Sequence, residues 1–428
     1  MKKLKWWCVV GLTAMGVALS GCGSSSNSGG DSASLRLVNA TLTHPSLDLL
    51  VNTSVSISGV LADTASAYVA PGSGSTTLQL NDAGVGTTLA TTLPTLAGGN
   101  HYTLFAYESA GSVKTVVLNE DTATPASGIA QLRVYNIAGD AGKLDVYITD
   151  PSVSLASAGS PISITTGTVP FSTIYTTYSP GTYRVRVTGY GNKSDLRLDM
   201  PIALTTQQIG TVVLSPASGG VLLNGSLVIQ QSTYSATRNT NVRLRLAAAV
   251  TPGATVSADA GGIAITAGSL APAFGFYTLV PATGALNVSV NSASVGAPAT
   301  PLVAGSDMTL LVYGNAGSAV ASLLTDDNRP PSDVTTVKLR LINGETGGVG
   351  ALTLTANNSL VATAIAAGTA SSYVSVPGST TAMNLTVNSS TSSTSFTNAN
   401  NILNPGGVYT VLLGGDVSAP QFLIRSTQ

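Results

Sequence analysis

The sequence predicts an all-β protein, built as a tandem array of about four antiparallel β-sandwich domains behind an N-terminal export signal. Its 428 residues exceed the usual domain size of about 100–150 residues, which indicates several domains. Polar and apolar residues alternate at a period of two, as in 184–187 (RVRV) and 384–387 (NLTV), which is typical of half-buried strands. Gly, Pro, Asn, Ser and Thr interrupt these strands about every ten residues, and no amphipathic helix is evident after residue 21.

The first residues have the pattern of a secretory signal peptide. Lysines at positions 2, 3 and 5 precede an apolar run from Trp6 to Leu19, which is shorter than the ~20 residues of a membrane-spanning helix. The run ends in Leu19-Ser20-Gly21-Cys22, which resembles the lipobox of bacterial lipoproteins. In that family the peptide is cleaved before the cysteine, whose thiol is diacylated and whose new amino group usually receives a further acyl chain such as palmitate.

The lipobox resemblance implies that residues 1–21 are a lipoprotein signal peptide and that cleavage separates Gly21 from Cys22. Lipid on Cys22 would then anchor the chain in a membrane. An ordinary signal peptide followed by an unmodified cysteine is the alternative. Residues 22–34 are rich in Gly and Ser and predict a flexible tether. Because Gly23 rather than Asp follows Cys22, similarity to Gram-negative sorting favours the outer membrane, on its periplasmic face or at the cell surface.

The composition argues against several classes of function. The 18 basic and 19 acidic residues give a net charge of −1 with no basic block, so no nucleic-acid partner is expected. Two His and two Cys are too few for most metal or nucleophile chemistry, so we expect no metal, no cofactor and no catalytic residues. Beyond residue 21 there is no Trp, and Cys22 is the only Cys, so no disulfide can form within the mature chain.

One opening strand recurs four times, about a hundred residues apart. Its copies are 35–39 (LRLVN), 132–136 (LRVYN), 244–248 (LRLAA) and 339–343 (LRLIN). Each copy precedes a second strand, a tyrosine near a proline and a turn, and a final apolar pair of strands. The repeats predict sandwich domains at 35–121, 131–236, 242–328 and 337–428, joined by short linkers and each folding largely around its own core.

A domain of ~100 residues with about seven short strands fits an antiparallel sandwich. Immunoglobulin-like and transthyretin-like strand orders are both compatible with the sequence, although the Cys…Trp…Cys pattern of true immunoglobulin domains is missing.

The repeats resemble the bacterial family called domain of unknown function 4397. The resemblance rests on LRLVN with LDLLV (47–51) in the first repeat and on LRVYN with LDVYI (144–148) in the second. The third and fourth repeats are degenerate, with Ala248 in place of the asparagine that ends the opening strand. The resemblance implies extracytoplasmic, repeated, lipid-anchored or surface-exposed sandwich domains, and it implies no activity.

Two residue types recur at one place in each repeat. The arginines of the opening strands are flanked by apolar residues, so we expect them to point to solvent and to discourage edge-to-edge aggregation, with a binding stripe for an anionic polymer as the alternative. The tyrosines before the third strand are expected to pack on the core with their hydroxyls bonded to backbone, with a ligand-stacking row as the alternative. These residues are Arg36, Arg133, Arg245, Arg340, Tyr68, Tyr175, Tyr277 and Tyr373.

The remaining candidates are histidines and acidic pairs. His44 and His101 are expected to be solvated loop residues, because a Ser–His–Asp site would need an activated serine and no G-x-S-x-G motif is present. Glu120-Asp121 and Asp326-Asp327 are expected to be acidic turns that pair with a neighbouring basic strand. Calcium sites at domain junctions are the alternative, although Ca²⁺ takes 6–8 oxygen ligands.

The sequence therefore predicts a non-enzymatic, lipid-anchored protein of the cell envelope. Its tandem sandwiches would act as a spacer or as an interaction surface, with the membrane as one partner through lipid on Cys22 and an envelope protein or glycan as another. The alternative is an adhesin-like module that binds polysaccharide or matrix.

Overall fold

The computed structural model describes residues 31–165, 169–345, 348, 350–391, 395–416 and 419–426. The predicted signal peptide, the cleavage site at Gly21, Cys22 and the tether up to residue 30 lie outside this part of the chain. Within it the predicted all-β class is confirmed: two 3₁₀ turns are the only helical segments. None of the helical segments in these described ranges is long and apolar enough to cross a bilayer.

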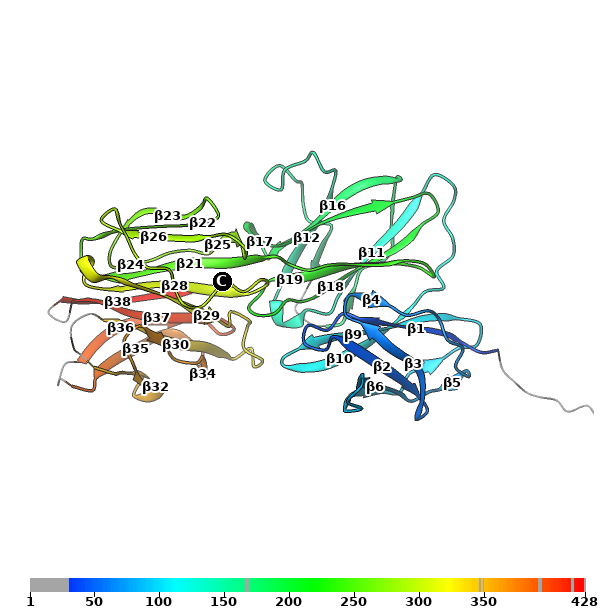
Figure 1. Ribbon diagram of the computed structural model, residues 1–428, viewed down its shortest axis with the longest axis horizontal. Helices are drawn as coiled ribbons and strands as arrows, with labels where there is room; N and C mark the ends of the chain where they lie inside the picture. Colours follow the sequence, from blue (N-terminus) through cyan, green and yellow to red (C-terminus); the bar gives the residue numbers. More distant parts are fainter. Residues whose placement is uncertain are drawn as a thin grey trace, which may run out of the picture.

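The strands form four consecutive units, each made of two sheets (Figure 1). Unit 1 joins the sheet β10-β9-β1-β4 to the sheet β3-β2-β6-β7, and β5 pairs with β8. Its strands are β1 (Ser34–Asn39), β2 (Ser46–Val51), β3 (Ser54–Leu61), β4 (Thr64–Ala65), β5 (Gly74–Ser75), β6 (Leu78–Asp82), β7 (Thr88–Thr92), β8 (Thr95–Leu96), β9 (His101–Ser109) and β10 (Ser112–Asn119).

Unit 2 joins the sheet β14-β11-β18-β19-β20, in which β15 also pairs with β11, to the sheet β13-β12-β16-β17. Its elements are β11 (Ala130–Asn136), η1 (Gly139–Ala141), β12 (Leu144–Thr149), β13 (Ser163–Thr165), β14 (Phe171–Ser172), β15 (Thr176–Tyr178), β16 (Gly181–Gly189), β17 (Asn192–Leu204), β18 (Ile209–Pro216), β19 (Leu223–Ile229) and β20 (Tyr234–Thr237).

Unit 3 joins the sheet β24-β21-β28-β29, in which β25 also pairs with β21, to the sheet β23-β22-β26-β27. Its elements are β21 (Asn241–Val250), β22 (Thr255–Ala260), β23 (Ile263–Leu270), β24 (Ala273–Phe274), β25 (Thr278–Pro281), β26 (Leu286–Val290), β27 (Ala293–Ser294), β28 (Asp307–Gly314), η2 (Ala316–Ser318) and β29 (Val320–Asp326).

Unit 4 joins the sheet β33-β30-β37-β38, in which β34 also pairs with β30, to the sheet β32-β31-β35-β36. Its strands are β30 (Thr336–Glu345), β31 (Leu352–Ala356), β32 (Ser359–Ile365), β33 (Thr369–Ala370), β34 (Val374–Pro377), β35 (Ser379–Ser389), β36 (Ser395–Leu403), β37 (Val408–Asp416) and β38 (Ala419–Ser426).

The opening strand of each unit pairs in parallel with the first strand of the final hairpin. The parallel pairs are β1 with β9, β11 with β18, β21 with β28, and β30 with β37. This differs from a purely antiparallel sandwich. A parallel pair needs a long crossover connection, and here the whole second sheet of the unit provides it.

The opening strands β1, β21 and β30 are buried on both faces, whereas the outer face of β11 is partly exposed. In β1, Leu35 and Leu37 enter the core of unit 1, whereas Arg36 and Val38 lie on the opposite face, which we call the outer face of the first sheet. The outer faces of units 1 and 2 pack together through Val38, Ala40, Phe105, Leu118, Ile137, Val213 and Val228. Those of units 3 and 4 pack together through Ala247, Ala249, Phe274, Leu311, Ile342 and Leu412.

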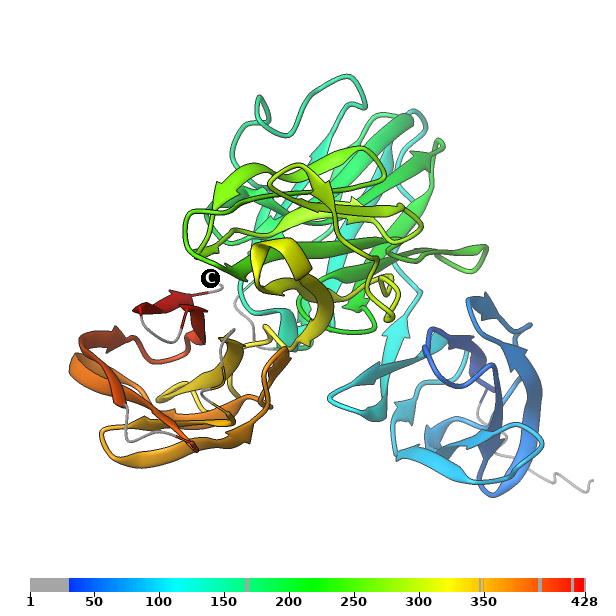
Figure 2. The same cartoon turned by 60° about the vertical axis from the view of Figure 1, so that its left-hand side comes forward.

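The contact between units 3 and 4 is close enough to require glycine. A Cβ on Gly344 would lie 2.3 Å from the Cβ of Ala249, and a Cβ on Gly414 would lie 2.7 Å from the same atom. Each unit thus has its own core, and a neighbouring unit also covers its outer face. Units 1 and 4 themselves lie at opposite sides of the molecule in both views (Figure 1, Figure 2).

Ion pairs join unit 2 to unit 3. Asp195 of β17 forms ion pairs with Arg197, at 2.7 Å, and with Arg243 of unit 3, at 3.1 Å. Arg243 forms a second ion pair with Asp307, at 2.9 Å. Burial alone would raise the pKa of Asp195, but the two arginines hold it below its usual value. The linker residue Arg238 reaches back to unit 1 and binds Asp63 at 2.7 Å. Consecutive units are therefore connected by side-chain contacts as well as by the linkers.

Candidate functional site

An Arg–Thr–Tyr set repeats on the outer face of every unit. The parallel register places each opening-strand arginine opposite a threonine of the final hairpin, and the arginine Nε donates to the threonine Oγ1. A tyrosine ring stacks on each guanidinium, with 4.6–5.0 Å between Cζ and the ring centroid. The sets are Arg36–Thr103–Tyr68, Arg133–Thr211–Tyr175, Arg245–Thr309–Tyr277 and Arg340–Thr410–Tyr373.

In unit 1 a buried carboxylate completes the set. Glu120 follows β10 and binds Arg36 at 2.9 Å, while the Tyr68 hydroxyl donates to Glu120 at 2.9 Å. The backbone N–H of Gln231, in unit 2, donates to the same carboxylate at 2.5 Å, and Arg36 donates to the carbonyl oxygen of Ser232. This cluster therefore fastens the turn after β19 to unit 1.

Units 3 and 4 share one carboxylate between two sets. Asp326 lies 3.5 Å from Arg245 of its own unit and forms an ion pair with Arg340 of unit 4. It also accepts hydrogen bonds from the hydroxyls of Thr309, at 2.6 Å, and Tyr277. Burial alone would raise the pKa of Asp326, yet Arg340 and Arg245 hold it below its usual value. Burial raises the pKa of Tyr277 well above its usual value, so its hydroxyl stays a donor.

The expectation that the opening-strand arginines face solvent is wrong for three of the four, whereas Arg133 is partly exposed. Arg36, Arg245 and Arg340 are 2%, 0% and 1% exposed. The period of two correctly turned them away from their own cores, but a neighbouring unit covers the outer face. A sequence signal for this was present, because the residue two positions after each arginine lies on the same face and is apolar or aromatic. These residues are Val38, Tyr135, Ala247 and Ile342.

The tyrosines and acidic residues also differ from expectation. The four tyrosine rings lie on arginines, and their hydroxyls meet side chains rather than backbone: Glu120, Thr211, Asp326 and Thr410. Pairing of the acidic residues with a basic strand is confirmed, but Glu120 and Asp326 are each only 4% exposed rather than solvated. Within the described ranges no group of three or more His, Cys, Asp or Glu residues could hold a metal ion.

Each histidine has an aspartate partner. His44 Nδ1 lies 3.2 Å from Asp82, and His101 Nδ1 lies 3.1 Å from Asp121. The His101 ring also makes an edge contact with Tyr68, with 5.6 Å between the centroids. Both are partly exposed; His44 lies in a loop as expected, whereas His101 is the first residue of β9.

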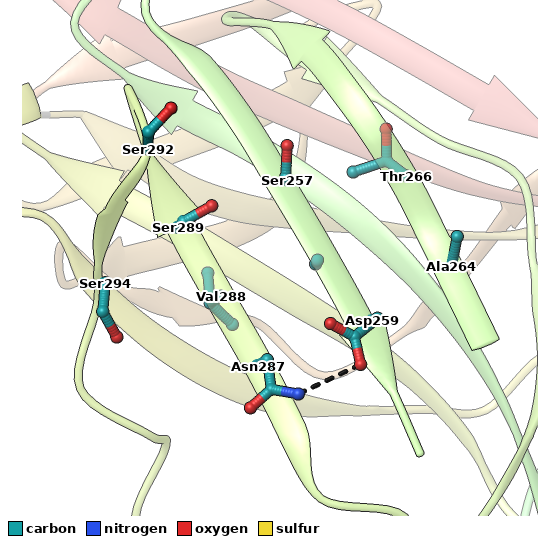
Figure 3. A pocket seen from close by; sticks show the side chains of 10 residues that line it. Ser257, Asp259, Ala264, Thr266, Asn287, Val288, Ser289, Ser292 and Ser294 are labelled. Carbon is teal, nitrogen blue, oxygen red and sulfur yellow. Dashed lines mark hydrogen bonds between the residues drawn. The ribbon is translucent and has the colours of Figure 1, made fainter. Parts of the chain in front are cut away.

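A shallow groove of about 430 Å³ lies on the second sheet of unit 3 (Figure 3). Ser257 and Asp259 of β22 alternate with buried Val256 and Ala258, so they point away from the core. Asp259 accepts a hydrogen bond from Asn287 at 3.1 Å across the strand pair. The rest of the lining consists of hydroxyl-bearing residues and apolar ones, namely Ser289, Ser292, Ser294, Thr266, Ala258, Ala264 and Val288. Such a surface offers hydrogen bonds to a neutral polar ligand.

Comparison with protein families bears on the first part of the chain. A model described as "Domain of unknown function (DUF4397)" matches residues 33–147. The predicted resemblance to this family is thereby confirmed for these residues. The DUF4397 match covers unit 1, continues through β11, which carries the LRVYN motif, and ends at residue 147 within β12, which carries the LDVYI motif. No curated protein matches the chain.

Arg133, within the DUF4397 match, departs from the pattern of the other three arginines. It donates to Thr211 at 3.0 Å and lies between the rings of Tyr175 and Tyr135, at 4.8 and 5.8 Å from their centroids. Among the residues whose side chains the structure describes, no Asp or Glu forms an ion pair with Arg133. The residue is partly exposed.

Proposed function

We propose that the protein is a non-enzymatic component of the cell envelope, anchored by lipid on Cys22, whose tandem sandwiches hold an interaction surface at a fixed position from the membrane. The observation that carries this proposal is the locking of the units to one another by buried charge clusters and apolar outer faces. A string of loosely joined domains would not hold a surface in one orientation, whereas packed units do.

The absence of catalysis is part of the proposal. The titratable groups that come together, Glu120 and Asp326, are occupied by arginine, threonine and tyrosine partners between packed units. A catalytic carboxylate needs access to substrate, and these carboxylates are buried under a neighbouring unit.

The anchor is supported by the lipobox resemblance of Leu19–Cys22. Labelling cells with an alkyne analogue of palmitate should mark the wild-type protein, and Cys22→Ala should abolish the label and release the chain from membranes. Retention of both label and membrane association in Cys22→Ala would contradict the anchor. Protease treatment of intact cells, compared with cells whose outer membrane has been permeabilised, then distinguishes the cell surface from the periplasmic face.

A second candidate, binding of a neutral polysaccharide, is favoured by the groove of unit 3, which combines hydroxyls with apolar side chains. Paired Asp and Asn side chains with surrounding hydroxyls match the donors and acceptors of a sugar. On a glycan array the wild-type protein should bind a defined set of neutral glycans, and Asp259→Ala should lose them. Asp333→Ala, which changes an exposed aspartate of the linker between units 3 and 4, is the matched control and should bind normally. An array without any bound glycan would exclude this candidate.

A further inference from the structure

Unit 2 has the arginine set of the other units but lacks its carboxylate. Thr103 pairs with Leu118 across the final hairpin of unit 1, and Glu120 lies two residues further on. Thr309 pairs with Leu324 in unit 3, and Asp326 again lies two residues further on. In unit 2 the pairing of Thr211 with Val228 places the uncharged Gln230 at this position.

The Gln230 side chain instead forms hydrogen bonds with the linker between units 1 and 2. Its Oε1 accepts from the backbone N–H of Thr122 at 3.0 Å, and its Nε2 donates to the carbonyl oxygen of Thr122 at 2.8 Å. In unit 4 the arginine pairs with a carboxylate of the neighbouring unit, because Arg340 forms an ion pair with Asp326 of unit 3. Unit 1 packs beside unit 2 as unit 3 does beside unit 4, but its acid, Glu120, is already bound to Arg36, Thr103 and Tyr68 of its own unit. Arg133 is therefore the one arginine of the four without a carboxylate among the described residues.

The groups that orient the guanidinium are nevertheless in place around Arg133. Thr211 fixes its Nε, and Tyr175 stacks on it with its hydroxyl 3.3 Å from the same threonine, much as Tyr373 lies 3.2 Å from Thr410 beside Arg340. A guanidinium held in this way presents its remaining N–H groups in a geometry suited to a carboxylate. Ile174, next to Tyr175, is 85% exposed. Arginine and tyrosine beside an exposed apolar residue are typical of contact residues in protein interfaces.

We propose that Arg133, with Tyr135 and Tyr175, binds an aspartate or glutamate side chain of a partner protein. Charge complementarity defines the chemistry of the partner, and the other units define its class, because in them the same set receives the side-chain carboxylate of an Asp or Glu delivered from the end of a strand. An acidic glycan or a phosphate group would offer the same charge without that precedent. The proposal deepens the interaction role proposed above, and its test does not depend on the anchor.

The test is a titration of the full chain in detergent micelles, labelled with ¹⁵N at the arginine Nε. The probe is N-acetylglutamate N-methylamide, and the uncharged control probe is N-acetylglutamine N-methylamide. The Arg133 resonance, assigned by its loss in Arg133→Lys, should shift and saturate with a millimolar Kd for the glutamate probe. The buried resonances of Arg36, Arg245 and Arg340 should stay in place and thereby serve as internal controls for folding.

A matched variant sharpens the test. Gln230→Glu restores an internal carboxylate at the position that is acidic in units 1 and 3, so it should weaken binding of the glutamate probe by about fivefold or more through competition. An equal response to the two probes, or an Arg133 resonance that does not move up to about 100 mM probe, would overturn the proposal. Tighter binding of methyl glucuronate or of inorganic phosphate would overturn it in favour of those ligands.

Discussion

Asp326 ends β29 of unit 3 and forms ion pairs with two arginines from different units, Arg245 at 3.5 Å and Arg340. One carboxylate thus balances part of the charge of two guanidinium groups that are almost fully shielded from water. This carboxylate therefore links units 3 and 4 electrostatically, in addition to the apolar packing between them.

Replacing Asp326 by Asn should strongly destabilise the protein. Two buried cations would lose their counter-ion, and removal of one member of a buried ion pair typically costs ~3–5 kcal/mol in the free energy of unfolding. Urea unfolding followed by circular dichroism measures the change. Asp333→Asn, at an exposed linker position, is the control and should change the free energy by less than about 0.5 kcal/mol. Equal stability of the two variants would show that the shared carboxylate is unimportant.

Adding one methyl group at Gly344 should force units 3 and 4 apart. In Gly344→Ala the new Cβ would meet the Cβ of Ala249 at 2.3 Å, well inside van der Waals contact, so we expect a loss of ~1–3 kcal/mol. The linker 327–335 should also be cut faster in limited proteolysis. Gly317→Ala is the control, because nothing lies within 4 Å of its added Cβ. A Gly344→Ala variant as stable and as protease-resistant as this control would contradict the close packing.

Truncating Phe105 should destabilise the protein although its side chain points away from the core of unit 1. The ring is fully buried between units 1 and 2 beside Tyr234, with 6.2 Å between the ring centroids. Phe105→Ala should therefore cost ~3–5 kcal/mol, as a core substitution does. Calorimetry of the full chain gives the change. Val85→Ala, at a side chain that is 72% exposed, should have little effect. A similarly small effect of both substitutions would argue that the two outer faces separate in solution.

Two aspartates at the junction of units 2 and 3 should have opposite effects on acid stability. The pKa of Asp195 is lowered in the folded protein, so its contribution to stability is present above the unfolded value near 3.8 and is lost as the pH falls through the folded pKa. The pKa of Asp307 is raised by burial despite Arg243, so its contribution is present below about 3.8 and is lost as the pH rises through the folded pKa.

Unfolding free energies measured between about pH 2 and pH 7 test this difference. Asp195→Asn should flatten the rise of stability with pH, because it removes a group that binds fewer protons when folded. Asp307→Asn should steepen the rise, because it removes a group that binds more protons when folded. If the two variants changed the slope in the same direction, the assignment of these pKa shifts would be wrong.

The sequence was sufficient to predict which side chains of a strand face the core of their own unit, because this depends only on neighbouring residues in the strand. The alternation around Arg36 correctly separates Leu35 and Leu37, which enter the core, from the arginine, which does not. It could not reveal the cover over that arginine, because Arg36 binds the carbonyl oxygens of Ile229 and Ser232, which are 193 and 196 residues away in the chain. Contacts between units depend on the packing of whole sheets, and no local pattern encodes their partner.

The sequence also could not predict the contacts of the candidate sites, because these depend on how distant strands pair. The repeated arginines and tyrosines were evident from the sequence as recurring positions, yet their stacking follows from a parallel register that the sequence did not predict. The loss of the carboxylate in unit 2 becomes visible only when Thr211 and Val228 are paired, since Gln230 has no special appearance in the sequence.

The parallel pairing of β1 with β9 also determines how unit 1 would respond to mechanical load. The chain N-terminal to Ser34 runs directly into β1, which pairs with β9 from Ser34–His101 to Asn39–Ala106. Tension on that segment pulls β1 lengthwise along its neighbour, so the hydrogen bonds between the two strands bear the force together rather than opening one after another. Unit 1 should therefore unfold at a higher force when it is pulled from this end than a unit whose strands separate one hydrogen bond at a time.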